Sequence, residues 1–141
     1  MMRAPLVLVV EDNEVNQLLT ASVLGREGFE ADIAATAEQA LEHLRVRTPD
    51  LILMDIQLPG MDGIALTRRI KADPATAHIV VVALTAHAMT GDREQTLAAG
   101  CAGYISKPID TRTFGNQVRA FLRPPVPSPG PTRTDATLSG T

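Results

Sequence analysis

Acidic, hydroxyl and ammonium groups follow short apolar runs at four places in the chain. Glu11 and Asp12 follow the first run, and Asp55 closes a second run. Thr85 and Lys107 follow two later runs. Carboxylate oxygens are ligands that Mg²⁺ prefers, and a metal ion beside an ammonium can neutralise a phosphoryl group during its transfer. If these run ends meet in space, the sequence predicts a site that holds Mg²⁺ and accepts a phosphoryl group.

The apolar runs alternate with amphipathic stretches five times. Strands are predicted at residues 6–10, 30–34, 51–55, 79–84 and 103–105. Runs that are almost wholly apolar are typical of strands buried on both faces of a parallel sheet. The alternation therefore predicts an α/β fold, with right-handed crossovers and helices on both faces of the sheet. Ligands bind at the carboxyl ends of the strands in such sheets, and the candidate residues stand at those ends.

The stretches between the strands carry apolar residues at helical spacing. The predicted apolar faces are Val15, Leu18, Leu19, Ser22 and Val23 in the first helix, Ala37, Ala40, Leu41 and Leu44 in the second, and Phe114, Val118, Phe121 and Leu122 in the last. The predicted helix boundaries are a capping box at Thr36 and Gln39, N-caps at Asp62 and Asp110 for the third and fifth helices, and stops at Gly28 and Gly100.

Size and composition exclude several classes of protein. The chain has 141 residues, which suits one domain. Its aromatic content of 3% and net charge of −3 argue against direct nucleic-acid binding. Cys101 is the only cysteine, so an internal disulfide and a cysteine-based metal site are excluded. The first apolar run is too short for a signal peptide or a membrane span, which predicts a cytoplasmic protein without membrane contact.

The composition changes at Pro124. Prolines recur through residue 131, and threonine, serine, glycine and alanine predominate after them. This predicts a folded domain over residues 1–123 and an extended, disordered tail or linker over residues 124–141. Whether this tail is a natural end or leads into a further domain stays open.

Four motifs together resemble one family. They are VVEDN at residues 9–13, LMDIQLPGMDG at 53–63, LTA at 84–86 and YISKP at 104–108. On these motifs, residues 6–122 resemble the CheY-like receiver domain of response regulators in two-component signalling. The chain is most similar to DivK-type single-domain regulators or to receivers of hybrid histidine kinases. The resemblance implies a flavodoxin-like, doubly wound fold with five helices and a five-stranded parallel sheet in the order 2-1-3-4-5, and it implies a bacterial source.

The resemblance also implies a role for each acidic residue. Asp55 would be the phosphoacceptor, receiving its group from a phosphohistidine of a histidine kinase or a histidine phosphotransfer protein. Asp12 and Asp55 would bind Mg²⁺ directly, Gln57 through its backbone carbonyl, and Glu11 through water. Gln57 and His87 would tune the rate of dephosphorylation.

A second set of residues would sense the phosphoryl group. Thr85, Ala86 and Lys107 would contact it, and Tyr104 would turn inward as Thr85 moves. This would remodel the face built from helix 4, strand 5 and helix 5, to which a downstream regulator or kinase would bind. The resemblance also suggests a cis peptide bond between Lys107 and Pro108.

Each candidate has a simpler interpretation when taken alone. Glu11 and Asp12 could cap a helix, Asp55 could form a turn, and Lys107 could be a solvated charge. Taken jointly, they favour a phosphoacceptor that catalyses only its own phosphorylation and dephosphorylation. The alternatives are a receiver belonging to a hybrid kinase or longer regulator, a receiver that binds without phosphorylation, and an independent enzyme such as a phosphatase or flavin protein. The first strand is not followed by a glycine-rich loop, which argues against the last of these.

Overall fold

Strands and helices alternate along the chain in the computed structural model. The structure describes residues 4–56, 62–86 and 92–122, and the account below concerns these residues. The strands are β1 (Leu6–Val10), β2 (Glu30–Ala34), β3 (Leu51–Asp55), β4 (Val80–Thr85) and β5 (Gly103–Ser106). The helices are α1 (Glu14–Arg26), α2 (Ala37–Val46), α3 (Gly63–Ala72), α4 (Asp92–Ala99) and α5 (Phe114–Leu122).

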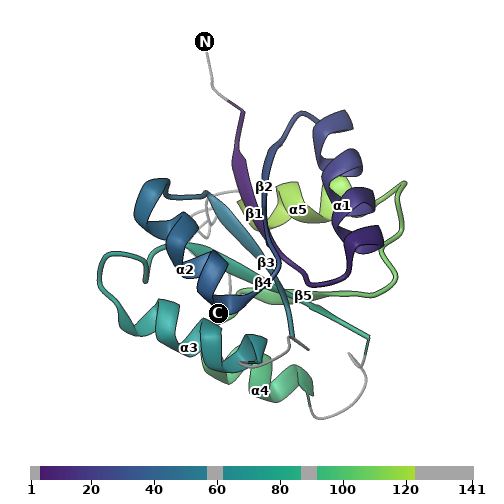
Figure 1. Cartoon of the computed structure of the whole chain (residues 1–141). Coiled ribbons are helices and arrows are strands. Elements are labelled where there is room, and N and C mark those ends of the chain that lie inside the picture. Colours follow the sequence, from purple (N-terminus) through teal and green to yellow (C-terminus); the bar gives the residue numbers. More distant parts are fainter. Residues whose placement is uncertain (1–3, 57–61, 87–91, 123–141) are drawn as a thin grey trace, which may run out of the picture.

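All the strands pair in parallel within one sheet, in the order β2-β1-β3-β4-β5 (Figure 1). Helices α1 and α5 cover one face of the sheet. Helices α2 and α3 cover the other face, and α4 packs beside α3. The predicted doubly wound fold and its strand order are therefore confirmed.

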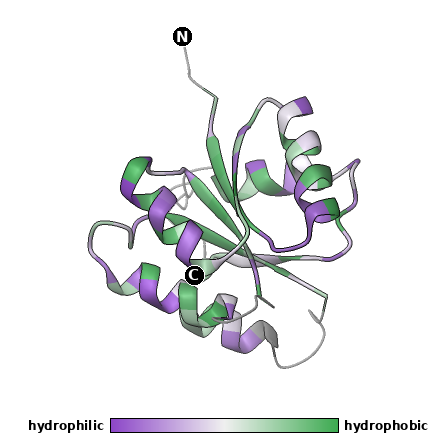
Figure 2. Ribbon diagram, in the orientation of Figure 1, coloured by the Kyte–Doolittle hydropathy of each residue, from purple (hydrophilic) through white to green (hydrophobic). Residues whose placement is uncertain are grey.

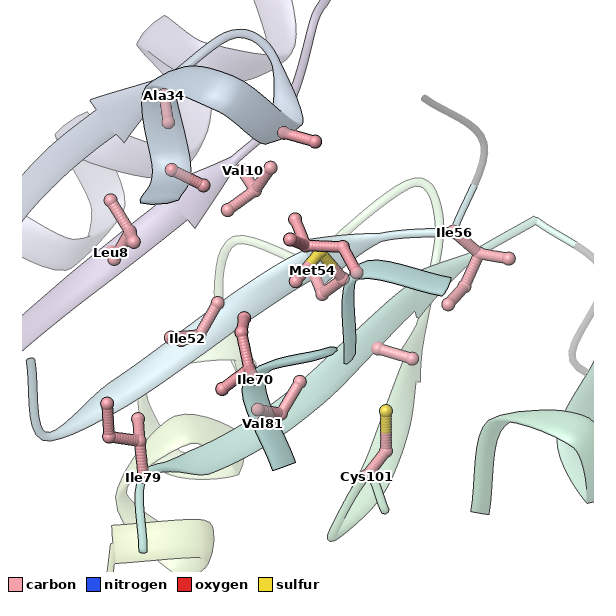
Figure 3. Close-up of a cluster of buried hydrophobic side chains, with 14 residues drawn as sticks. Leu8, Val10, Ala34, Ile52, Met54, Ile56, Ile70, Ile79, Val81 and Cys101 are labelled. Carbon is pink, nitrogen blue, oxygen red and sulfur yellow. The ribbon is translucent and has the colours of Figure 1, made fainter. Parts of the chain in front are cut away.

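Each face of the sheet has its own apolar cluster, because successive residues of a strand point to opposite faces. In β1, Leu8 and Val10 join the cluster beneath α2 and α3, which Figure 3 shows. Val7 and Val9 join the cluster beneath α1 and α5. Burial on both faces explains why the central strands are almost wholly apolar, as Figure 2 shows by their green colour.

The predicted bounds of β1, β2 and β3 are confirmed, and the last two strands differ slightly. β4 begins one residue later than predicted and ends at Thr85, and β5 extends to Ser106. The two extensions at the carboxyl ends follow from strand pairing, since Thr85 and Ser106 are partners in the ladder between β4 and β5. Thr85 is thus the last residue of its strand and not the first residue beyond it.

Side-chain caps start α2 and α3 as predicted. The Thr36 hydroxyl accepts a hydrogen bond from the Gln39 amide at 3.1 Å. The Gln39 side chain reaches back to the amide of Ala35 at 2.8 Å, one residue before the cap itself. Asp62 accepts from the amide of Ala65 at 2.7 Å. These bonds satisfy amides at the helix ends that have no partner within the helix.

The predicted N-cap of the last helix is wrong in its position. Asp110 accepts a hydrogen bond from the amide of Arg112 at 2.9 Å, so it caps a turn over residues 111–113. α5 begins only after this turn, at Phe114. At the other helix ends, Gly28 and Gly100 have φ angles of 91° and 114°, which is the left-handed conformation expected of a glycine stop.

Helix α1 buries a face that only partly matches the predicted one. Of the predicted face, Val23 is buried, but Val15 and Leu18 are 72% and 70% exposed, and Thr20 and Leu24 are buried in their place. Apolar residues lie on both faces of α1, so spacing alone does not determine which face packs on the sheet. The outer face keeps an exposed apolar set, called here the α1 stripe, which consists of Val15, Leu18 and Leu19.

The predicted tail, residues 124–141, lies outside the described residues, so the domain boundary at residue 123 stays a prediction. Among the described helices, none combines the length and the apolar character that crossing a bilayer requires.

Candidate functional site

The three acidic candidates converge at the carboxyl ends of β1 and β3. These strands are neighbours, with Val10 opposite Met54, so the residues that follow them lie side by side. One carboxylate oxygen from each of Glu11, Asp12 and Asp55 lies within 4.8 Å of the others. Glu11 and Asp55 are only 1% and 4% exposed, whereas Asp12 is exposed. The cluster is therefore buried on its inner side and open on its outer side.

The backbone around Glu11 explains why its side chain points inward. The Glu11 amide donates to the carbonyl of Ala34 at 3.0 Å, which extends the pairing of β1 with β2 by one residue. The Glu11 carboxylate accepts from the Asn13 amide at 3.2 Å. Asn13 then caps α1 by accepting from the amide of Asn16 at 3.0 Å. The chain turns sharply between strand and helix, and the turn leaves Asp12 on the rim.

Lys107 brings a positive charge to this cluster from the end of β5. Its amide donates to the carbonyl of Thr85 at 2.9 Å, and the peptide bond between Lys107 and Pro108 is cis. The ammonium lies 3.1 Å from a carboxylate oxygen of Glu11 and 3.4 Å from one of Asp55. Burial by itself would lower the pKa of Lys107, but the attraction of Asp55 and Glu11 outweighs it, and the pKa is raised. The ammonium therefore stays charged between two buried carboxylates.

The predicted sensing residues lie along β4 and β5. Thr85 is buried and ends β4, and Ala86 is exposed just beyond it. Tyr104 is half-buried and packs against the cluster beneath α2 and α3. Since alternate residues of a strand share a face and Ala83 is the partner of Tyr104, the side chains of Thr85 and Tyr104 project from the same face. Gln57 and His87 lie outside the described residues.

Gly63 shapes the site in a way that the sequence did not indicate. The N-cap predicted at Asp62 makes Gly63 the first residue of α3, and in the structure Gly63 is buried there and packs directly on the backbone at the end of β3. A Cβ at this position would overlap the carbonyl oxygen of Asp55 and lie 2.9 Å from the Cα of Ile56. The absence of a side chain thus lets α3 begin directly against the residue that carries the candidate nucleophile.

The chemistry of the cluster suits a hard divalent cation. The clustered groups are carboxylates, and hard cations such as Mg²⁺ prefer oxygen ligands. Three carboxylates so close together repel one another, and Lys107 offsets only part of that charge. A separate hollow of about 460 Å³ lies near the C-terminal ends of α2 and α3. Its lining has one carboxylate, Asp73, so it lacks the group of acidic residues that a divalent cation would need.

Comparisons with known proteins agree with this geometry. A family model described as response regulator receiver domain matches residues 7–119. The chain belongs to the response regulator receiver domain family. It is therefore a receiver of the kind found in two-component signalling, and the predicted family is confirmed.

Individual receivers are similar over most of the chain. The polar-differentiation response regulator DivK of Brucella ovis is 42% identical over 116 residues, covering 82% of this chain and 94% of the relative. The receiver domain of sensor histidine kinase PA1611 from Pseudomonas aeruginosa has a TM-score of 0.77 and 34% identity, covering 84% of this chain and 98% of that one. That structure is described as having a magnesium ion coordinated in its active site cleft.

A more distant receiver shares the fold alone. The chemotaxis response regulator CheY4 of Vibrio cholerae has a TM-score of 0.79 at 21% identity, covering 84% of this chain and 98% of that chain. The similarity of fold at such low sequence identity supports the CheY-like architecture of the receiver.

Proposed function

We propose that this receiver accepts a phosphoryl group on Asp55 from a phosphohistidine of a histidine kinase or a histidine phosphotransfer protein. The observation that carries the proposal is the placement of Asp55. Its carboxylate is buried, lies 3.4 Å from the Lys107 ammonium, and belongs to the cluster with Glu11 and Asp12. A nucleophile, a positive charge and a set of oxygen ligands thus share one small site.

In the transfer, a carboxylate oxygen of Asp55 forms a bond to phosphorus as the bond from phosphorus to the donor imidazole nitrogen breaks. The imidazole leaves with the electron pair of that bond and takes up a proton. The Lys107 ammonium already lies beside the Asp55 carboxylate, so it can pair with a negatively charged phosphoryl oxygen once the group is attached there. The product is an acyl phosphate on Asp55.

The cofactor in this proposal is Mg²⁺. Asp12 and Asp55 would hold it directly, Glu11 through water, and Gln57 through its backbone carbonyl. When bound, Mg²⁺ supplies positive charge that offsets the repulsion between the Asp55 carboxylate and the phosphoryl oxygens. The exposed position of Asp12 leaves a side of the cluster where an ion and a donor can approach.

The output of the receiver would be partner binding. Thr85, with Ala86 next to it, would be drawn toward the phosphoryl group, and Tyr104 would follow, since Thr85 and Tyr104 share one face of the sheet. This change would alter the face built from α4, β5 and α5, and a downstream regulator or kinase would bind there. Gln57 and His87 would set how long the phosphoryl group lasts.

The α1 stripe offers a contact surface for the donor protein. α1 starts two residues after Asp12, on the side of the sheet opposite α2 and α3 (Figure 1). A donor that delivers its phosphohistidine to Asp55 must approach this rim, and exposed Leu18 gives it an apolar anchor. We expect Leu18→Asp to slow transfer from a phosphohistidine protein and to leave phosphorylation by acetyl phosphate unchanged. Equal rates of transfer from the phosphohistidine protein to the wild type and to Leu18→Asp would show that the α1 stripe does not contact the donor.

In this proposal the protein is a cytoplasmic phosphoacceptor that catalyses only its own phosphorylation and dephosphorylation, and it stands alone or forms part of a longer regulator or hybrid kinase. Intact mass spectrometry after incubation with acetyl phosphate and Mg²⁺ tests the central step. We expect one added phosphoryl group in the wild type, and none with EDTA or in Asp55→Ala. A protein that gains no adduct and binds no beryllofluoride would refute the proposal.

A further inference from the structure

Thr20 is a buried polar residue close to the phosphoryl site. It lies on the inner side of α1, is 3% exposed, and forms no hydrogen bond through its hydroxyl with any residue in the described ranges. Thr67 in α3, which is also buried, donates to the carbonyl of Gly63 at 2.7 Å, as a threonine within a helix often does. Buried hydroxyls nearly always have a partner, so the isolation of Thr20 requires an explanation.

A small hollow next to Thr20 supplies that explanation. Its volume is about 30 Å³, and its polar lining comes from Thr20, Asn16, Glu11 and Lys107. Its remaining walls are apolar. A water molecule needs roughly 10–15 Å³ and two to four polar partners. The hollow therefore has the size and the polar groups to hold a water molecule.

Lys107 provides a second group to which a water molecule in the hollow can bond. An ammonium has three N–H donors. Two carboxylates lie near it, those of Glu11 at 3.1 Å and Asp55 at 3.4 Å, and the hollow adjoins the same side chain. A water in the hollow can accept the third N–H of Lys107 and bond to the Thr20 hydroxyl, which satisfies both groups at once.

We propose that an ordered water molecule occupies this hollow and links the Thr20 hydroxyl to the Lys107 ammonium, which makes Thr20 a positioning residue of the phosphoryl site. The water holds the ammonium on the α1 side while its other donors face the carboxylates. Thr20 touches neither the carboxylate of Asp55 nor the phosphoryl group, and it acts only through Lys107. The part of this inference that concerns phosphorylation rests on the proposed function of Asp55.

Two substitutions separate the hydroxyl from the shape of the side chain. Thr20→Val keeps the shape and removes the hydroxyl, and Thr20→Ser keeps the hydroxyl and removes a methyl group. A high-resolution crystal structure of the unphosphorylated wild type should show a water within hydrogen-bond distance of Thr20 Oγ1 and Lys107 Nζ. The structure of Thr20→Val should lack the bond to residue 20. A dry hollow in the wild type would overturn the proposal.

Stability and rate give two further readouts. If water satisfies the hydroxyl, Thr20→Val lowers the urea midpoint, whereas a dry, unpaired hydroxyl makes the same change raise it. Phosphorylation by acetyl phosphate should be slower in Thr20→Val by about twofold to tenfold, the range for one hydrogen bond, and faster in Thr20→Ser than in Thr20→Val. A raised midpoint, or equal rates in all three proteins, would overturn the positioning role. If even the wild type accepts no phosphoryl group, the proposed function fails, and the electron density and urea midpoint still decide the water site.

Discussion

Substitution of Gly63 by alanine tests how closely α3 approaches the phosphoacceptor. The added Cβ would overlap the carbonyl oxygen of Asp55 and lie 2.9 Å from the Cα of Ile56, so both obstacles are backbone atoms that cannot rotate away. Overpacking typically costs about 1–3 kcal/mol. The loss of chain entropy in the unfolded state offsets about 0.4–1 kcal/mol of that cost. We therefore expect Gly63→Ala to lower the free energy of unfolding by about 1–2 kcal/mol.

Gly25→Ala is the matched control. Gly25 also lies in a helix, and a Cβ there would meet nothing within 4 Å. The same substitution should raise the free energy of unfolding by about 0.5–1 kcal/mol, since alanine is the better helix former. Urea denaturation followed by circular dichroism measures both variants. The reasoning is refuted if Gly63→Ala is as stable as the wild type, or if both variants change stability in the same direction.

Three further predictions follow from the charges and burial of particular groups. The pKa of Glu27 is lowered, chiefly by its hydrogen bond from Arg119 at 2.7 Å, so its contribution to stability exists above the ordinary glutamate pKa and is lost as the pH falls through the lowered value. In Glu27→Gln, the free energy of unfolding measured by urea denaturation should fall less steeply as the pH is lowered. A fall as steep as that of the wild type would contradict this. Burial raises the pKa of the Cys101 thiol, so a disulfide reagent should react slowly with the native protein and rapidly in urea; rapid native reaction would show that Cys101 is accessible. Calorimetry should find that Lys107→Ala binds Mg²⁺ more tightly and Asp12→Asn more weakly, each by about tenfold, as expected for the change of one neighbouring charge. Affinities that move the other way would contradict the assignment of the acidic cluster as the metal site.

Local signals in the sequence were sufficient to predict the strands and the acidic cluster. The apolar runs of β1 and β3 fix their burial, and the parallel sheet then brings Glu11 and Asp12 beside Asp55. Thr36 could be identified as an N-cap because the capping bond joins residues only three positions apart. These features depend on short-range spacing and on the rule that ligand sites of parallel sheets lie at the carboxyl ends of the strands.

Features that depend on distant parts of the chain were not predictable in the same way. Helix α1 has apolar residues on both faces, and only its packing on the sheet decides that Thr20 is buried and Leu18 exposed. The bond from Arg119 to Glu27 joins residues 92 positions apart. The close contact of Gly63 with the backbone of Asp55 and Ile56 depends on how α3 packs against the end of β3, and a glycine next to an N-cap gives no sign of it. Spacing along the chain does not encode these contacts.

Chemical trapping of the acyl phosphate tests the central claim most directly. The wild-type protein would be incubated with acetyl phosphate and Mg²⁺, reduced with borohydride, digested, and mapped by mass spectrometry. Borohydride reduces an aspartyl phosphate to homoserine, which marks the residue that carried the phosphoryl group. We predict homoserine at position 55 alone, and none when EDTA is present. A mark at Asp12 or elsewhere, or an unmodified Asp55 under every condition, would contradict the assignment of Asp55 as the phosphoacceptor.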